Sequence, residues 1–163
     1  MNKQRAYALM RQALALASHS PDPNTQNAAI LASDDGEFLA FEVNEFPWLV
    51  AQTDERWERP TKYFYVEHAE RNVLYSALRN GVPTKGNTIV CPWAACADCA
   101  RGIIQSGIAT LIRLPSVNHG HWEESCRIAD EMFAEAGVKV IELTEPLGEV
   151  TPIRRDNQLW KPE

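Results

Sequence analysis

The order of the predicted secondary-structure elements is the feature that most constrains the fold. Short apolar runs, which favour strands, alternate along the chain with longer segments that have helical periodicity. We expect strands over residues 28–31, 38–43, 88–91, 109–114 and 138–143, and helices over residues 3–19, 67–80, 97–106 and 122–136. From residue 67 onward helices and strands alternate, which predicts a mostly parallel sheet with helices packed on its faces.

The segments outside this alternation are expected to be a hairpin, a long loop and a tail. The turn signal Asp34-Asp35-Gly36 separates the first two apolar runs, so we expect an antiparallel hairpin there. Residues 44–66 contain two prolines and two tryptophans and are predicted to form a long irregular loop of the kind that is usually functional. The tail, about residues 144–163, has three prolines and is expected to be irregular.

Length, charge and apolar content exclude several classes of protein. The chain has 163 residues, which predicts a single domain over residues 1–163. Its formal net charge of -6 argues against a nucleic-acid binder, which needs a basic face. No apolar run approaches the roughly 18 residues of a membrane span, and the first residues do not have the pattern of a signal peptide. Four cysteines without a secretion signal favour a reducing compartment, so we expect a cytoplasmic protein.

The motif Cys96-Ala97-Asp98-Cys99 opens a predicted helix directly after a predicted strand. Backbone N–H groups and the helix dipole at such a position lower thiol pKa values and favour thiolates. The pair therefore either binds a metal ion or cycles as a dithiol. Its position late in the chain speaks against a thioredoxin-like redox motif. A structural zinc site usually needs four protein ligands, and the sequence has no second C-x-x-C.

A second motif, His68-Ala69-Glu70, opens the preceding predicted helix. One histidine and two cysteines leave the fourth position of a zinc ion open for water, which is typical of a catalytic site. Two thiolates neutralise the zinc charge and acidify the water less, so a nearby carboxylate that takes and returns protons would compensate. Glu70 lies two residues from His68 on a helix and suits this task better than metal binding. The two motifs together predict a catalytic zinc centre.

These motifs resemble those of the cytidine and deoxycytidylate deaminase superfamily, whose signature is H-x-E followed by P-C-x-x-C. Within the superfamily, the sequence is most similar to the deoxycytidylate (dCMP) deaminase branch, over about residues 5–143. The resemblance rests on residues 22–26, 44–47, 68–73, 96–100 and 103–108. It implies a single-domain α/β fold, a three-layer α/β/α arrangement around a five-stranded mixed sheet.

The resemblance also implies an activity. His68, Cys96 and Cys99 would bind one zinc ion, and Glu70 would move protons while water attacks C4 of a cytosine ring and ammonia leaves. The implied substrate is a free pyrimidine nucleotide, with conversion of dCMP to dUMP favoured. The alternatives are another cytosine- or purine-type substrate, including a base in tRNA, or an inactive nucleotide-binding relative. Family habit predicts a homo-oligomer, either a dimer, a tetramer or a hexamer.

Candidate substrate-binding residues follow from the same comparison of motifs. Asn44 matches the family asparagine expected to contact the sugar or base. Trp93, beside the metal-binding turn, is expected to shape the pocket or stack on a base, and Arg71 to pair with either a phosphate or a surface carboxylate. The full set is Asn24, Asn44, Ala69, Arg71 and Trp93.

Three positions depart from the family pattern. Ala95 stands where the family has proline before the first cysteine. Glu42 and Glu45 stand where the family's G-Y-N-G segment has glycines, and they add negative charge next to Asn44. Outside the pattern, His119 and His121 flank a glycine in a predicted loop and are further candidates for substrate contact.

Overall fold

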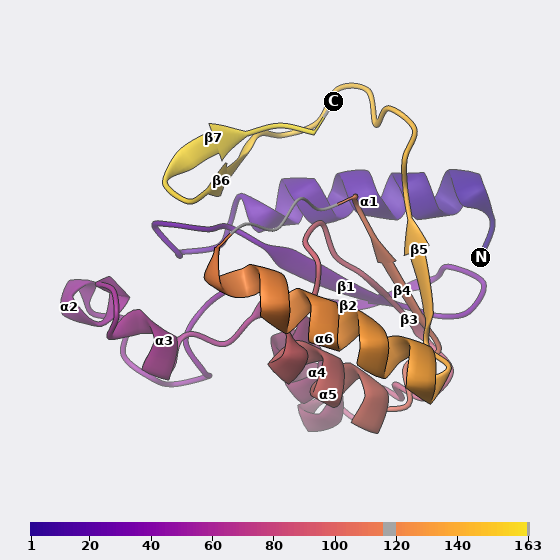
Figure 1. The fold of residues 1–163 in the computed structure, drawn as a ribbon, viewed down its shortest axis with the longest axis horizontal. Helices are drawn as coiled ribbons and strands as arrows, with labels where there is room; N and C mark the ends of the chain where they lie inside the picture. Colours follow the sequence, from indigo (N-terminus) through magenta and orange to yellow (C-terminus); the bar gives the residue numbers. More distant parts are fainter. Residues whose placement is uncertain (116–119, 163) are drawn as a thin grey trace.

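The computed structural model describes residues 1–115 and 120–162, and only the backbone of residue 121 (Figure 1). Its centre is a five-stranded sheet with the strand order β2-β1-β3-β4-β5. The strands are β1 (Ala28–Ala32), β2 (Phe38–Val43), β3 (Thr88–Val90), β4 (Thr110–Arg113) and β5 (Lys139–Glu142). Strand β1 pairs antiparallel with β2 and β3, and β3, β4 and β5 are parallel. The mixed five-stranded sheet and the first hairpin are therefore confirmed.

Helices cover both faces of this sheet, which gives three layers (Figure 1). The long helices are α1 (Lys3–Ala17), α4 (Ala69–Arg79), α5 (Ala97–Gln105) and α6 (His121–Ala136). Helix α1 packs on one face against Ile30 and Val90, while α4, α5 and α6 pack on the other against Leu31 and Ile89. Successive strand residues point to opposite faces, so a strand covered on both sides must be apolar throughout. This explains why every residue of β1 is buried.

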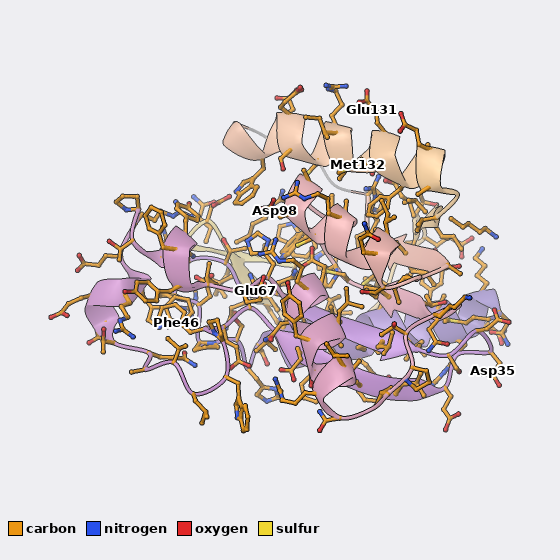
Figure 2. All side chains as sticks on the ribbon, turned by 90° about the horizontal axis from the view of Figure 1, so that it is seen from below. Asp35, Phe46, Glu67, Asp98, Glu131 and Met132 are labelled. Carbon is orange, nitrogen blue, oxygen red and sulfur yellow. The ribbon has the colours of Figure 1, made fainter. Side chains whose placement is uncertain are left out.

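The loop predicted to be irregular between β2 and α4 contains two short helices, so this prediction was wrong in part. They are α2 (Asp54–Trp57) and α3 (Lys62–Tyr65). Phe46 is buried at the start of the segment and its ring lies 4.2 Å from that of Trp57 and 5.6 Å from that of Tyr65 (Figure 2). One-turn helices have no periodic sequence signal and depend on tertiary packing of this kind.

The tail is also more regular than predicted. Residues 153–160 form a hairpin of β6 (Ile153–Arg155) and β7 (Gln158–Trp160). Its two turn residues, Asp156 and Asn157, have φ angles of 48° and 67°. Asp and Asn tolerate this left-handed conformation, and two such residues make the tight turn that suits an antiparallel hairpin. The prediction of an irregular tail rested on its three prolines and did not consider this dipeptide.

Of the other sequence predictions, some agree with the structure and some concern residues that it does not describe. The predicted helix ends at Gly81 and Gly107 are confirmed, with φ angles of 68° and 72°. The side chains of His119 and His121 lie outside the described residues, so their contact with substrate stays a prediction. Over the described ranges, no helix is both long and apolar enough to cross a membrane.

Candidate active site

A cavity of about 540 Å³ opens where the first turns of α4 and α5 meet. Its walls include the turn before β1, the α3 region, the starts of α4, α5 and α6, and the hairpin β6–β7. His68, Glu70 and Cys96 all line it. This volume is within the usual range for small-molecule sites.

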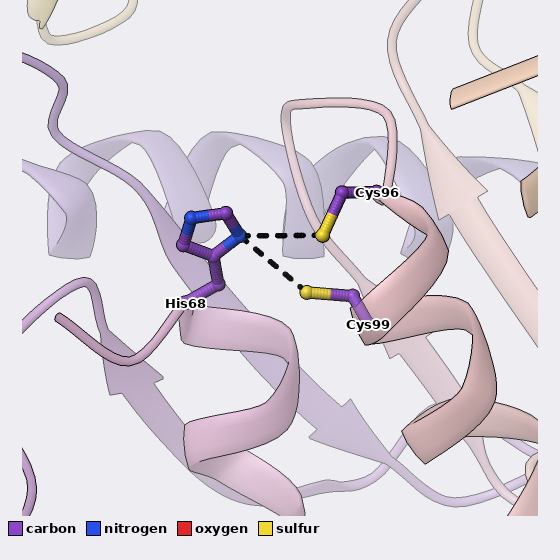
Figure 3. Close-up of side chains that lie close together, drawn as sticks. All are labelled: His68, Cys96 and Cys99. Carbon is purple, nitrogen blue, oxygen red and sulfur yellow. Dashed lines mark hydrogen bonds between the residues drawn. The ribbon is translucent and has the colours of Figure 1, made fainter. Parts of the chain in front are cut away.

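The structure brings together the three predicted metal ligands (Figure 3). His68 is the N-cap residue of α4, Cys96 is the N-cap residue of α5, and Cys99 lies in the first turn of α5. The Nδ1 atom of His68 lies 3.6 Å from the Sγ atom of Cys96 and 3.6 Å from that of Cys99. Bonds of about 2.3 Å from zinc to sulfur and about 2.1 Å to nitrogen, at a tetrahedral angle, would place nitrogen and sulfur roughly 3.6 Å apart. The three side chains therefore fit a zinc ion.

The two cysteines have opposite electrostatic environments. A hydrogen bond from the Cys99 thiol, followed by one from His68, lowers the pKa of Cys96 to about 4. The same contact with Cys96, together with burial, raises the pKa of Cys99 well above its ordinary value. A bound cation would favour the thiolate form of both side chains.

Glu70, the predicted proton carrier, lies in the first turn of α4 and is only 2% exposed. Burial is the main cause that raises its pKa above the ordinary value, and the charge of His68 opposes this shift. Its Oε2 atom accepts a hydrogen bond of 3.3 Å from the Nδ2 atom of Asn27. Asn27 also contacts the Sγ atom of the buried Cys91 at 3.3 Å. Sequence reasoning missed Asn27, although a polar residue next to a wholly apolar strand was a signal.

Asn44 lines the cavity and holds two parts of the chain together. Its Oδ1 atom accepts a hydrogen bond of 2.9 Å from the backbone N–H of Ala69. Its Nδ2 atom donates to the carbonyl of Thr25 at 3.1 Å. Ala69 itself is fully buried. Asn44 therefore joins the start of α4 to the turn before β1.

Three of the predicted substrate-binding residues, Ala69 among them, are not part of the cavity lining. In the described part of the chain, neither Arg71 nor Asn24 is among the residues that line the cavity. Arg71 forms ion pairs with Glu67 and Asp98, both labelled in Figure 2, and so realises the carboxylate alternative of its prediction. Asn24 donates to the side chain of Asn157 at 2.8 Å.

Trp93 lies in the cavity wall, as predicted. Its indole N–H donates to the carbonyl of Gln26 at 3.0 Å, which fixes the ring. The Trp160 ring of β7 lies 4.4 Å away, and the guanidinium of Arg155 lies 4.7 Å above the Trp93 ring. Sequence reasoning missed Trp160 and Arg155 because they belong to the tail that was expected to be irregular.

A buried ion pair forms another part of the wall that the sequence did not reveal. The Nζ atom of Lys62 lies 2.8 Å from both carboxylate oxygens of Asp22, and both side chains are less than 5% exposed. Asp22 also accepts hydrogen bonds from the backbone N–H groups of Asn24 and Thr25. The pair thereby fastens α3 to the turn before β1. A lysine within an aromatic cluster gave no sequence signal for burial.

The fold and the site together define a class of protein. A three-layer sheet fold, one histidine and two cysteine ligands at the starts of two helices, and a buried glutamate two residues after the histidine are the features of zinc-dependent deaminases.

Comparison with known proteins identifies the family. Residues 3–114 match the family model for the cytidine and deoxycytidylate deaminase zinc-binding region. Human deoxycytidylate deaminase is 30% identical over 135 residues, which are 79% of this chain and 74% of that protein. An uncharacterized deaminase in the luxG 3′ region of Aliivibrio fischeri is 30% identical over 77% of this chain and 84% of its own. The chain belongs to this family of zinc-binding, hydrolytic deaminases.

Solved structures support the fold independently. The dCMP deaminase of cyanophage S-TIM5, in complex with dCMP and dUMP, superposes with a TM-score of 0.67 at 22% identity. The match covers 88% of this chain and 99% of the phage chain. A diaminohydroxyphosphoribosylaminopyrimidine deaminase/reductase from Thermotoga maritima gives a TM-score of 0.62 at 23% identity, over 85% of this chain and 36% of that one. At these identities the likeness concerns the fold.

Proposed function

We propose that this enzyme converts dCMP and water to dUMP and ammonia. The observation that carries the proposal is the His68, Cys96 and Cys99 set, with 3.6 Å between nitrogen and each sulfur, in one cavity with the buried Glu70. The relationship to human deoxycytidylate deaminase supports a pyrimidine nucleotide as the substrate. The residues 22–26 and 44–47, which resemble the dCMP branch, form part of the cavity wall through Asp22 and Asn44.

The residues of the chain divide the work in this reaction. His68, Cys96 and Cys99 would hold a zinc ion, which would supply a Lewis acid that makes water more acidic. Glu70 takes a proton from the attacking water and gives it to the ring nitrogen beside C4 while the C4–O bond forms. It then takes the remaining proton from the hydroxyl at C4 and passes it to the amine, so that the C4–N bond breaks and ammonia leaves. The hydrogen bond from Asn27 holds the Glu70 carboxylate in place during these transfers. Burial of Glu70 excludes bulk water from this route and keeps its proton affinity high.

Ammonia release from a substrate panel tests the proposal. Zinc-loaded protein is assayed with dCMP, CMP, dCTP and cytidine, and we expect the highest kcat/KM with dCMP. The absence of turnover with every cytosine compound overturns the proposal. Turnover restricted to a purine or to a base in tRNA moves the enzyme to another branch of the family.

Replacement of the proposed proton carrier tests the mechanism separately. Glu70→Gln keeps the size and polarity of the side chain, so we expect one zinc ion per chain to remain bound. Loss of general acid–base catalysis lowers the rate by about 10²–10⁴-fold or more. Glu55→Gln, which changes an exposed glutamate on α2, is the matched control and leaves the rate unchanged. An unchanged rate for Glu70→Gln removes this residue from the mechanism.

The compartment and the assembly are part of the same proposal. The four cysteines form no disulfide with one another, which is consistent with the expected reducing, cytoplasmic environment. The homo-oligomeric state, whether dimer, tetramer or hexamer, stays a prediction from the family. Phe64 and Leu78 are more than three-quarters exposed, and exposed apolar side chains are common where subunits associate.

A further inference from the structure

The hairpin β6–β7 closes one side of the active-site cavity. Arg155, Gln158, Leu159 and Trp160 all belong to the cavity wall. This hairpin lies outside residues 3–114, the part of the chain that matches the family model. It shares this cavity with His68 and Cys96, so its side chains line the space that a substrate would occupy.

The hairpin is fastened to the turn before β1 by a series of hydrogen bonds. The backbone of Arg154 accepts from the N–H of Gln26 at 2.8 Å, and its own N–H donates to the Gln26 side chain at 2.9 Å. At the turn, the N–H of Asn157 donates to the carbonyl of Asn24 at 2.9 Å. These contacts hold Arg155, which lies between them, in a defined position.

The charged residues around the cavity indicate that the hairpin side would face the phosphate of a nucleotide. Among the described lining residues, the cationic side chains are Arg59, Lys62 and Arg155. Lys62 is buried against Asp22, whereas Arg59 and Arg155 lie on the side of the cavity that the hairpin closes, where Arg59 contacts Asp156 of the hairpin turn at 3.3 Å. The guanidinium of Arg155 lies over the ring of Trp93, itself in the cavity wall. Arginine binds phosphate through a planar fork of N–H donors, even when its face is stacked on an aromatic ring.

An anionic substrate would need cationic side chains close to it, because the protein as a whole is acidic. Its net charge is -6, and Asp22, Glu70 and Asp156 all lie along the same cavity. Trp93 connects the two ends of the site, since it lies three residues before Cys96 in the sequence and packs against Trp160 of the hairpin. A nucleotide with its base at Glu70 would thus extend along Trp93 toward Arg155.

We propose that Arg155, assisted by Arg59, binds the 5′-phosphate of the substrate, so that the C-terminal hairpin selects a nucleotide over a nucleoside. The inference rests on the proposed function, because it assigns the phosphate contact of that same site. It predicts a role in substrate affinity, while the proton transfers at Glu70 remain independent of the hairpin.

Kinetics with and without the phosphate test this assignment. Arg155→Gln, which retains a long polar side chain and removes the charge, is expected to raise KM for dCMP by on the order of tenfold to a hundredfold. KM for deoxycytidine and kcat for dCMP stay close to those of the unchanged protein. Arg155→Lys keeps the charge and should restore part of the affinity. An equal increase of KM for dCMP and deoxycytidine overturns the assignment.

Arg154→Ala is the matched control. Arg154 is the neighbouring residue on β6, has the same charge, and donates to the carbonyl of Pro23 at 3.3 Å outside the cavity lining. Its replacement removes the same charge from the same strand, yet should leave KM for dCMP nearly unchanged. Thermal unfolding of each variant checks that the hairpin change leaves the protein folded. A KM increase as large as that of Arg155→Gln assigns the effect to the hairpin as a whole and contradicts the proposal.

Direct binding separates this inference from the proposed function. Calorimetry compares dUMP with deoxyuridine on the unchanged protein and on Arg155→Gln. If the unchanged protein deaminates no cytosine compound but binds dUMP more tightly than deoxyuridine, and Arg155→Gln removes the difference, the proposed reaction fails and the phosphate site stands. If dUMP and deoxyuridine bind equally well to the unchanged protein, or if Arg155→Gln keeps the difference, the phosphate site is excluded whatever the activity.

Discussion

At the scale of single residues, Glu45 shows how a departure from the family pattern is accommodated. Its side chain is partly buried next to Asn44, and its Oε1 atom accepts a hydrogen bond of 3.4 Å from Asn72. Burial, reinforced by the charge of Glu42, raises the pKa of the Glu45 carboxyl. A carboxyl with a raised pKa in the folded state binds its proton more tightly there than in the unfolded chain, so its ionisation lowers stability.

Glu45→Gln should therefore raise the melting temperature at pH 7. The gain arises because the neutral amide keeps the polar contact with Asn72 and removes the cost of the buried charge. The difference from the unchanged protein should disappear below pH 4.5, the ordinary pKa, where the carboxyl is protonated in both states. Thermal melts between pH 3.5 and 8 measure this, since these values bracket the ordinary carboxyl pKa by about one unit or more.

Glu37→Gln is the control for the removal of one negative charge, because Glu37 is exposed beside the first hairpin. The same gain in both variants at every pH would attribute the effect to net charge. A loss of stability in Glu45→Gln at pH 7 would contradict the proposed cost of ionisation.

At the scale of elements, the two helices that supply the metal ligands receive their N-terminal caps from elsewhere. The N-cap side chains of α4 and α5 are His68 and Cys96, and neither makes a capping hydrogen bond. Both are turned instead toward the metal site. The first N–H of α4 donates to Asn44, and that of α5 donates to the hydroxyl oxygen of Ser125 on α6 at 3.0 Å. Metal binding and local capping compete for the same residue, and neighbouring elements supply the missing acceptors.

Ser125→Ala should lower the stability of the protein by about 1 kcal/mol, the usual cost of a lost cap. It should also weaken zinc binding several-fold, because the first turn of α5 positions both Cys96 and Cys99. Chemical denaturation and a competitive zinc titration measure the two effects. Ser125→Thr keeps the hydroxyl and is expected to restore both. If Ser125→Ala leaves stability and zinc affinity unchanged, the contact with α5 has no capping role.

At the scale of the whole molecule, the fold has its own support apart from the metal. Two clusters of buried side chains lie on opposite faces of the sheet, one under α1 and one under α4, α5 and α6. The second includes Ala69, Val73 and Ile103 from the helices that bear the ligands. These contacts would hold α4 and α5 against the sheet without zinc.

Removal of zinc by a strong chelator should therefore abolish activity and leave the secondary structure intact. We expect a lower melting temperature, because a ligand at 100 times its Kd stabilises the folded state by about 2.7 kcal/mol. Circular dichroism reports the structure, and ammonia release after zinc is restored reports the site. Unfolding on chelation would instead identify a structural metal.

Much of this protein follows from local sequence. The H-x-E and C-x-x-C motifs predicted the three ligands that the structure brings together, because each motif lies at the start of a helix that periodicity already defines. The order of the long elements was predicted for the same reason. Short elements were not: α2 and α3 depend on the packing of Phe46, and the hairpin β6–β7 depends on backbone contacts with residues 24–26.

The sequence by itself determined the family, the order of the long helices and strands along the chain, and the set of metal ligands. These features depend on spacings of a few residues. Tertiary structure alone decided the environment of that set. The packed fold forms the hydrogen bond from Asn27 to Glu70 and the buried ion pair of Lys62 with Asp22. It also positions the guanidinium of Arg155 over the ring of Trp93. The partners in each of these contacts are more than 30 residues apart in the sequence. No local pattern specifies such contacts, since they exist only after the sheet and both helical layers have packed.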